Sequence, residues 1–160
     1  MSNNSELNKL SELIQDIRIA MFVTQEQDTL RSRPMATHGL ENGFLWFFTY
    51  KNSHKKSEIE AQPSVNISYQ DPSKELYVSV SGNAEIVEDR AKIEELWKPF
   101  LKAWFPNGKE DPNIALIRVD ISQAEYWDAP SSTMVQLIGM VKAAVTGKPY
   151  QAGENKKISV

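Results

Sequence analysis

The first regular hydrophobic pattern in the chain extends from Glu6 to Ile17. Its leucines and isoleucines recur every three or four positions, at Leu7, Leu10, Leu13, Ile14 and Ile17. This spacing is typical of one face of an amphipathic helix. The pattern predicts a helix that covers the rest of the fold as a lid and contributes nothing to its core.

Beyond this helix, short runs of β-branched and aromatic residues predict strands. Residues 19–24 and 30–37 flank a polar turn and predict a hairpin. Pro34 lies in its second strand and cannot donate a ladder hydrogen bond, so we expect it at a sheet edge, at a bulge or beside a ligand. Further strands are predicted over residues 44–50, 65–69, 76–87 (with a bulge near Gly82) and 114–127.

Three more helices are predicted between and after these strands. Ser53 is a candidate cap for a helix over residues 54–61, and Asp89 for a helix whose apolar stripe continues toward residue 104. A terminal helix is predicted over residues 134–145, before a polar tail. About six antiparallel strands with short flanking helices favour a closed barrel, because closure removes exposed sheet edges. We therefore expect one mainly β domain over residues 1–160.

The composition excludes several kinds of site. The 160 residues include 18 basic and 21 acidic side chains, a formal charge of −3, which disfavours non-specific binding to nucleic acids. With no cysteine and only His38 and His54, the chain offers no ligand set for a cysteine or histidine metal site. No apolar run approaches the ~18 residues of a membrane-spanning helix, and the N-terminus lacks the pattern of a secretion signal. We expect a cytoplasmic protein without a metal.

Positive charge gathers in one stretch of this acidic chain. Between positions 31 and 56 there are five basic residues and one acidic residue. Within this stretch, the spacing Thr49-x-x-x-Ser53-x-Lys55 offers two hydroxyls, an ammonium group and the free N–H groups of a helix start, and Arg33 adds a guanidinium. Such groups bind a terminal phosphate. The alternative is a solvated, basic strand edge beside a capped surface helix.

Several segments resemble the pyridoxamine 5′-phosphate oxidase family, whose fold is the FMN-binding split barrel. The flavin-binding stretch of that family is similar to Arg33-Pro34-Met35-Ala36-Thr37-His38, to residues 47–55 and to Gln62-Pro63-Ser64-Val65. Residues 95–97, 102–112, 124–128 and 146–147 are similar to its bacterial general stress protein branch. The resemblance covers nearly the whole chain and implies a six-stranded antiparallel split barrel.

The resemblance also implies a cofactor and an assembly. It implies a homodimer with two FMN sites at the interface, in which FAD is also possible, and a small-molecule redox partner. By motif position, Arg33 and Lys55 bind the flavin phosphate, with Ser53 and His54 beside them. The other implied flavin contacts are Pro34, Met35, Phe48, Thr49, Tyr77, Trp104 and Trp127.

The sequence departs from the true oxidases where they bind their substrate. Those enzymes follow the last-strand tryptophan with an Arg-x-His element, whereas here Trp127 is followed by Asp128-Ala129-Pro130, and His38 replaces a lysine of the first motif. Without these cations a substrate phosphate would be buried with little compensation. We therefore do not expect a true pyridoxamine 5′-phosphate oxidase.

Two classes of function follow from a flavin site with a changed substrate. We expect a flavin-dependent oxidoreductase linked to the stress response, whose substrate and catalytic residues the sequence does not identify. The alternative is a non-catalytic flavin carrier or sensor, and a third option is haem or a deazaflavin in the same barrel. His38 is a candidate acid or base because its ordinary pKa is near neutrality, with a purely local hydrogen-bonding role as the alternative.

Overall fold

The computed structural model describes residues 2–128, 144, 145, 147 and 154–159. Its helices are α1 (Ser2–Ile14), α2 (His54–Ala61) and α3 (Arg90–Leu96), with two short 3₁₀ helices, η1 (Pro72–Lys74) and η2 (Pro99–Ala103). Its strands are β1 (Ile19–Glu26), β2 (Thr29–Glu41), β3 (Phe44–Tyr50), β4 (Ser64–Asp71), β5 (Leu76–Val87), β6 (Ile114–Asp128) and β7 (Glu154–Ser159). The terminal helix predicted over residues 134–145 falls almost wholly outside the described residues.

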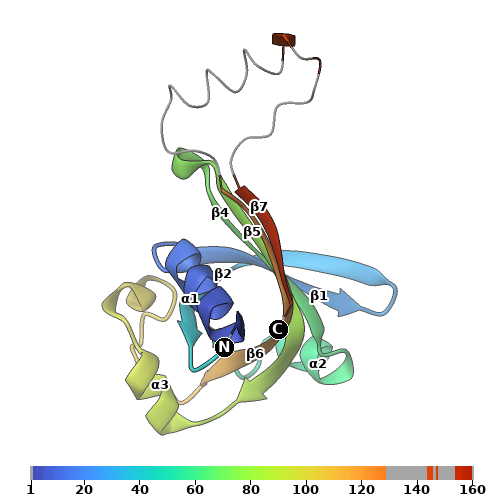
Figure 1. Cartoon of the computed structure of the whole chain (residues 1–160). Helices are drawn as coiled ribbons and strands as arrows, with labels where there is room; N and C mark the ends of the chain where they lie inside the picture. The colour runs from blue at the N-terminus through green and yellow to red at the C-terminus, as the bar shows by residue number, and fades with distance from the viewer. Residues whose placement is uncertain (1, 129–143, 146, 148–153, 160) are drawn as a thin grey trace.

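The strands form one antiparallel sheet in the order β3-β2-β1-β4-β5-β6-β7, and pairing between β3 and β6 closes six of them into a barrel (Figure 1). Strand β6 is long enough for two tasks. Its residues 114–120 pair with β3, and its residues 123–128 pair with β7. The predicted six-stranded antiparallel barrel is confirmed.

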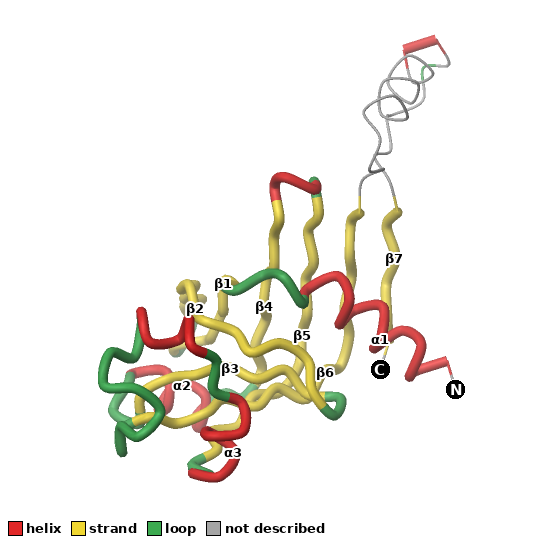
Figure 2. Tube along the Cα trace, turned by 90° about the vertical axis from the view of Figure 1, so that its left-hand side faces the viewer, coloured by secondary structure: helices red, strands yellow, loops and turns green. Residues whose placement is uncertain are grey.

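The ends of β4, β5, β6 and β7 continue beyond the barrel as a sheet extension (Figure 2). Strand β7 lies where the sequence predicted only a polar tail, and that prediction is wrong. Its one described buried side chain, Ile158, is 1% exposed. A single apolar residue among charged ones is too weak a pattern to predict a strand.

Helix α1 lies across the inner face of this extension (Figure 2). Leu10 and Ile14 are buried in the same hydrophobic cluster as Val78, Tyr126 and Ile158 of the extension. The predicted amphipathic helix is confirmed, but the expectation that it contributes nothing to the core is wrong. Helix α1 covers one face only, and no other described helix lies on the opposite face of the extension.

The β1–β2 hairpin has the predicted edge at Pro34. Residues 29–36 of β2 pair with β1, whereas residues 37–41 pair with β3. Pro34 is opposite Met21 of β1, in the part of β2 that has no second partner among the described strands. The missing N–H of proline therefore breaks no ladder hydrogen bond.

The predicted bulge at Gly82 is also confirmed. The register between β5 and β6 shifts between Ser81 and Gly82, because Ser122 of β6 is the extra residue. A Cβ atom at position 82 would overlap the carbonyl oxygen of Asp120. Only glycine allows the two strands to approach this closely where the barrel passes into the extension.

The helix predicted after Asp89 is shorter than expected. Asp89 caps it by accepting a hydrogen bond from the backbone N–H of Lys92, but α3 ends at Leu96. Trp97 and Lys98 are extended because Pro99 disfavours helical backbone in the residue before it. The chain then turns through η2. None of the helices in the described part of the chain is long and apolar enough to cross a membrane.

Candidate functional site

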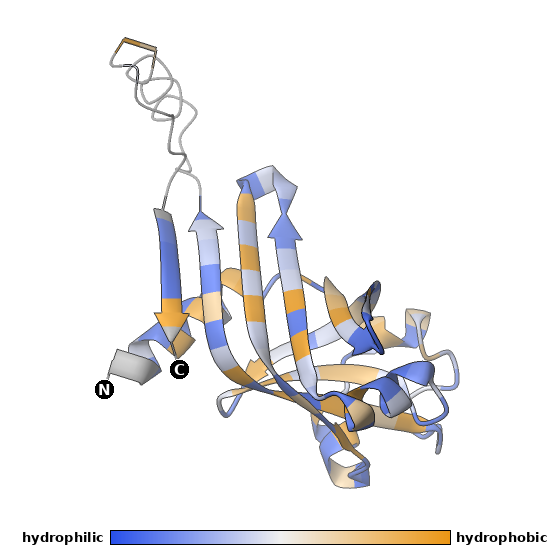
Figure 3. Cartoon of the chain, turned by 90° about the vertical axis from the view of Figure 1, so that its right-hand side faces the viewer, coloured by the Kyte–Doolittle hydropathy of each residue, from blue (hydrophilic) through white to orange (hydrophobic). Residues whose placement is uncertain are grey.

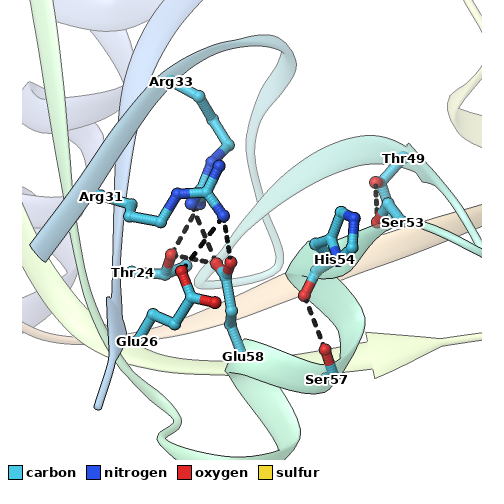
Figure 4. Close-up of polar contacts among 9 residues, drawn as sticks. All are labelled: Thr24, Glu26, Arg31, Arg33, Thr49, Ser53, His54, Ser57 and Glu58. Carbon is cyan, nitrogen blue, oxygen red and sulfur yellow. Dashed lines mark hydrogen bonds and ion pairs between the residues drawn. The ribbon is translucent and has the colours of Figure 1, made fainter. Parts of the chain in front are cut away.

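The candidate phosphate-binding residues come from three elements that meet at one side of the barrel. Arg33 is on the edge part of β2, Thr49 is near the end of β3, and Ser53, His54 and Lys55 are at the start of α2. Helix α2 packs against β1 and β5, which fixes its position relative to the hairpin. The fold therefore brings these five sequence-predicted residues to one region, and Figure 4 shows all of them except Lys55.

A buried carboxylate on α2 organises the arginines of the hairpin. Glu58 is 6% exposed, and its two oxygens accept hydrogen bonds from Arg31 and Arg33, each at 2.9 Å. Thr24 of β1 donates to Glu58 at 2.5 Å and accepts from Arg33 at 2.7 Å. Alternate positions on β2 share a face, so both guanidinium groups meet above the same carboxylate (Figure 4).

The charge of Glu58 is stabilised by these partners. Burial alone raises the pKa of its carboxyl group, but the Thr24 hydroxyl and the charges of Arg33 and Arg31 more than offset that effect. The pKa of Glu58 therefore lies below its ordinary value, and the carboxylate stays ionised at neutral pH.

Glu58 was not among the site residues predicted from the sequence. A glutamate in a short helix is usually solvated, and the only local signal is its place one turn after Lys55. Its partners lie more than twenty residues earlier in the chain, in the β1–β2 hairpin. Its role therefore depends on tertiary packing that no local pattern reveals.

Lys55 is a half-buried cation beside this cluster. Burial lowers the pKa of its ammonium group, and the nearby charge of Arg33 lowers it further, with Glu58 opposing both effects. Within the described part of the chain, no carboxylate oxygen lies within 4.0 Å of its Nζ atom. Arg31 also pairs with the exposed Glu26 at 3.3 Å. Of the residues that the structure describes here, three cations thus face two carboxylates, and Lys55 is the cation without a carboxylate partner, an arrangement suited to an anion.

The start of α2 adds hydroxyl groups and a shallow hollow. Ser53 occupies the predicted N-cap position, but its side chain makes no capping hydrogen bond. Its Oγ atom lies 3.3 Å from Oγ1 of Thr49 instead. The hollow measures about 330 Å³ and is lined by Lys51, Asn52, Ser53, His54, Lys56, Ser57 and Glu60.

The residues predicted to contact a flavin ring differ in their exposure. Met35 is 5% exposed and Phe48 is 2% exposed, and both side chains belong to the hydrophobic core. Phe48 packs edge-on against Trp97, with ring centroids 5.8 Å apart. Pro34 is exposed. Met35 and Phe48 are therefore buried as whole residues in this chain, whereas Pro34 can offer a ligand its ring.

Three predicted aromatic contacts lie outside this cluster. Tyr77 of β5 and Trp127 of β6 are paired across the extension and are 46% and 41% exposed. Strand β5 is three strands from β2, and Trp127 lies beyond residues 114–120, the part of β6 that β3 joins to β2. Trp104, 47% exposed, follows η2, and its carbonyl oxygen accepts a hydrogen bond from Tyr50 at 3.3 Å. A single chain therefore does not bring Tyr77 and Trp127 to Arg33.

His38 has local hydrogen-bond partners. Its Nδ1 atom lies 3.0 Å from the carbonyl oxygen of Leu96, and its Nε2 atom lies 3.0 Å from a carboxylate oxygen of Glu41. Burial, followed by the charge of Lys98, lowers the pKa of the imidazole against the opposing effects of Glu41 and Leu96. The Nδ1 atom thus ties β2 to the end of α3, the Nε2 atom bonds within β2, and His38 makes the local hydrogen bonds that the alternative interpretation expected.

The buried carboxylate makes stability depend on pH. The folded-state pKa of Glu58 is depressed, so its contribution to the free energy of unfolding is present at neutral pH and is lost as the pH falls below about 4.5. We expect Glu58→Gln to lower the free energy of unfolding at pH 7 by about 2 kcal/mol, less than for a fully buried pair because Arg31 is half exposed. Urea unfolding at pH 7 and pH 3 measures this, and the deficit should shrink at pH 3.

Glu60→Gln is the matched control, because Glu60 is exposed on the same helix. Its free energy of unfolding should stay within about 0.5 kcal/mol of the parent. A deficit for Glu58→Gln that is the same at both pH values would contradict the assigned charge interaction.

Comparison with known proteins agrees with this architecture. A model of the family described as pyridoxamine 5′-phosphate oxidase like matches residues 5–151. Protein bli-3 of Neurospora crassa is 30% identical over 168 aligned positions, which cover 98% of this chain and 80% of that protein. General stress protein 26 of Bacillus subtilis is 26% identical over 140 positions, covering 86% of this chain and 99% of that protein.

One solved structure adds a similarity in three dimensions. The crystal structure of a general stress FMN/FAD binding protein from Xanthomonas citri has a TM-score of 0.66 and 30% sequence identity, covering 78% of this chain and 92% of that one. Together with the family model, which spans most of the sequence, these similarities confirm the family resemblance of the motifs. The chain belongs to the pyridoxamine 5′-phosphate oxidase like family, with general stress proteins among its relatives.

Proposed function

We propose that this protein binds a flavin nucleotide, FMN or FAD, and acts as a flavin-dependent oxidoreductase. The observation that carries the proposal is the half-buried Lys55, which lacks a carboxylate partner among the described residues and lies beside Arg33. The relative from Xanthomonas citri, an FMN/FAD binding protein, supports the identity of the ligand. The general stress relatives support a link to the stress response.

The residues present suit the phosphate of a flavin nucleotide. Among the described residues, Lys55 supplies a charge that has no carboxylate partner, Arg33 supplies a guanidinium held in place by Glu58, and Thr49 and Ser53 supply hydroxyls that lie within hydrogen-bond distance of each other. A phosphate dianion accepts hydrogen bonds from all of these groups. When bound, the flavin ring would carry the electrons, and the chain would orient it and shield it from water.

Neighbouring lysines on α2 provide a direct test of flavin binding. We expect Lys55→Ala to weaken FMN binding by roughly 1.5–3 kcal/mol, the value of a hydrogen bond to a charged group. Riboflavin, which lacks the phosphate, should bind weakly to the parent and be unaffected by the change. Fluorescence titration of purified protein measures both ligands.

Lys56→Ala is the control, because Lys56 pairs with Glu88 at 3.1 Å and so has its own partner. It should leave FMN affinity unchanged. If Lys56→Ala weakened FMN and Lys55→Ala did not, the phosphate would lie in the hollow at the start of α2. Equal affinities of the parent protein for riboflavin and FMN would rule out the proposed phosphate site.

We also propose that the flavin site is completed in a homodimer. The outer face of the extension and of the adjoining strands carries four exposed apolar or aromatic side chains: Met21, Leu30, Tyr77 and Trp127. Burial alternates along β5 and the second half of β6, so the residues immediately before Tyr77 and Trp127 in each strand are buried. Figure 3 shows the matching alternation of hydropathy along these strands. An exposed patch of this kind suggests an interface. In a dimer, a second copy would supply the contacts that one chain keeps apart from Arg33.

The molar mass in solution tests the proposed homodimer. We expect light scattering with saturating FMN to give about twice the 18.2 kDa of one chain. A charge placed in the exposed patch, Trp127→Glu, should shift the mass toward the monomer, because a buried carboxylate at an interface is costly. A parent mass near 18.2 kDa with flavin bound would rule out the dimer.

The substrate should differ from that of the true oxidases. Asp128, which follows Trp127, places a carboxylate where those enzymes have cations, and like charge opposes an incoming phosphate. We expect flavin-loaded protein to oxidise NADH or NADPH in the presence of an electron acceptor. We expect it to form pyridoxal phosphate from pyridoxamine phosphate at a rate well below ~1 s⁻¹, the low end of ordinary enzyme rates. Absence of acceptor-dependent consumption would indicate a carrier.

A further inference from the structure

Arg31 is the cation of the cluster that a single phosphate does not need. Arg33 and Lys55 are the two cations that the proposed site assigns to the phosphate of FMN, which leaves Arg31 without a role there. Arg31 is two residues closer to the hairpin turn, and its side chain is 48% exposed, against 16% for Arg33. It therefore stands at the open side of the cluster, farther out than Arg33.

The hydrogen bonds of Arg31 leave one edge of its guanidinium available. Both of its bonds, to Glu58 at 2.9 Å and to Glu26 at 3.3 Å, come from the same nitrogen, Nη1. Within the described residues, Nη2 and Nε of Arg31 have no hydrogen-bond partner. Arg33, in contrast, uses Nη1 for Thr24 and Nη2 for Glu58. The free Nη2 and Nε edge of Arg31 has the geometry that binds phosphate oxygens in pairs.

Glu58 fixes where that free edge lies. One carboxylate oxygen holds Arg31 and the other holds Arg33, so the two guanidinium groups are neighbours (Figure 4). In a pyrophosphate, two phosphates are linked through one oxygen and are likewise neighbours. A ligand whose first phosphate bonds Arg33 and Lys55 would place its second phosphate on the open side, beside Arg31.

We propose that Arg31 binds the second phosphate of a flavin dinucleotide and so determines the preference for FAD over FMN. The inference rests on the proposed flavin site and adds the ligand class that this site prefers. Glu26 opposes it, because its exposed carboxylate competes for Arg31 and repels a second phosphate.

The test compares two flavins on the same variants. We expect Arg31→Gln to weaken FAD binding about tenfold, the value of a charge-assisted contact, and to change FMN binding less than about twofold. Arg31→Lys keeps the charge but loses the paired donors, and should fall between the parent and Arg31→Gln for FAD. Glu26→Gln removes the competitor and should strengthen FAD binding several-fold without affecting FMN.

The FMN measurement on each variant shows whether the first phosphate site is intact. Arg118→Gln is the matched control, because it removes an arginine from an exposed ion pair with Glu85 elsewhere in the barrel, and it should affect neither flavin. An equal loss of FMN and FAD affinity in Arg31→Gln, no loss of either, or a parent that binds FMN but not FAD would overturn the inference alone. A parent that binds neither flavin would overturn the proposed function with it.

Discussion

The contact of Glu58 with the hairpin arginines is the interaction on which the candidate site depends. A carboxylate with 6% exposure is tolerated only because Thr24, Arg31 and Arg33 together replace the water that it has lost. The same bonds hold α2 against the β1–β2 hairpin and fix two flexible arginine side chains. The arginines of the proposed anion site are thus held in place before any anion binds, at the expense of one buried acidic group.

The balance of charge around this contact separates a structural ion pair from a binding site. If Glu58 and Glu26 neutralised every nearby cation, the cluster would serve only to join α2 to the hairpin. Lys55 changes this, because burial and the charge of Arg33 lower the pKa of its half-buried ammonium group, which has no carboxylate partner among the described residues. A protein that leaves a cation in this condition loses some stability, and binding an anion restores it.

Much of this molecule could be predicted from its sequence, and the failures have physical causes. Sequence patterns located β1 to β6 and α2. Strands β1, β4 and β5 bury one face and alternate regularly, whereas β3 is a short apolar run that is buried on both faces. The buried role of α1 and the strand β7 were missed, since both depend on contacts with distant strands. The motif around Arg33 and Lys55 predicted the cations. The role of Glu58 could not be predicted, because it depends on the packing of α2 against the hairpin.

The closure of the barrel by β3 and β6 has a consequence for how the chain folds. The two strands are far apart in the sequence, with Tyr50 paired to Ile114. Bringing them together closes a long loop and costs conformational entropy. Barrels dominated by such distant pairings fold in milliseconds to seconds. The β1–β2 hairpin and α2 are close in sequence, so their contact closes a much shorter loop. The cation cluster, whose hydrogen-bonded members all lie within residues 24–58, can therefore assemble before the barrel closes.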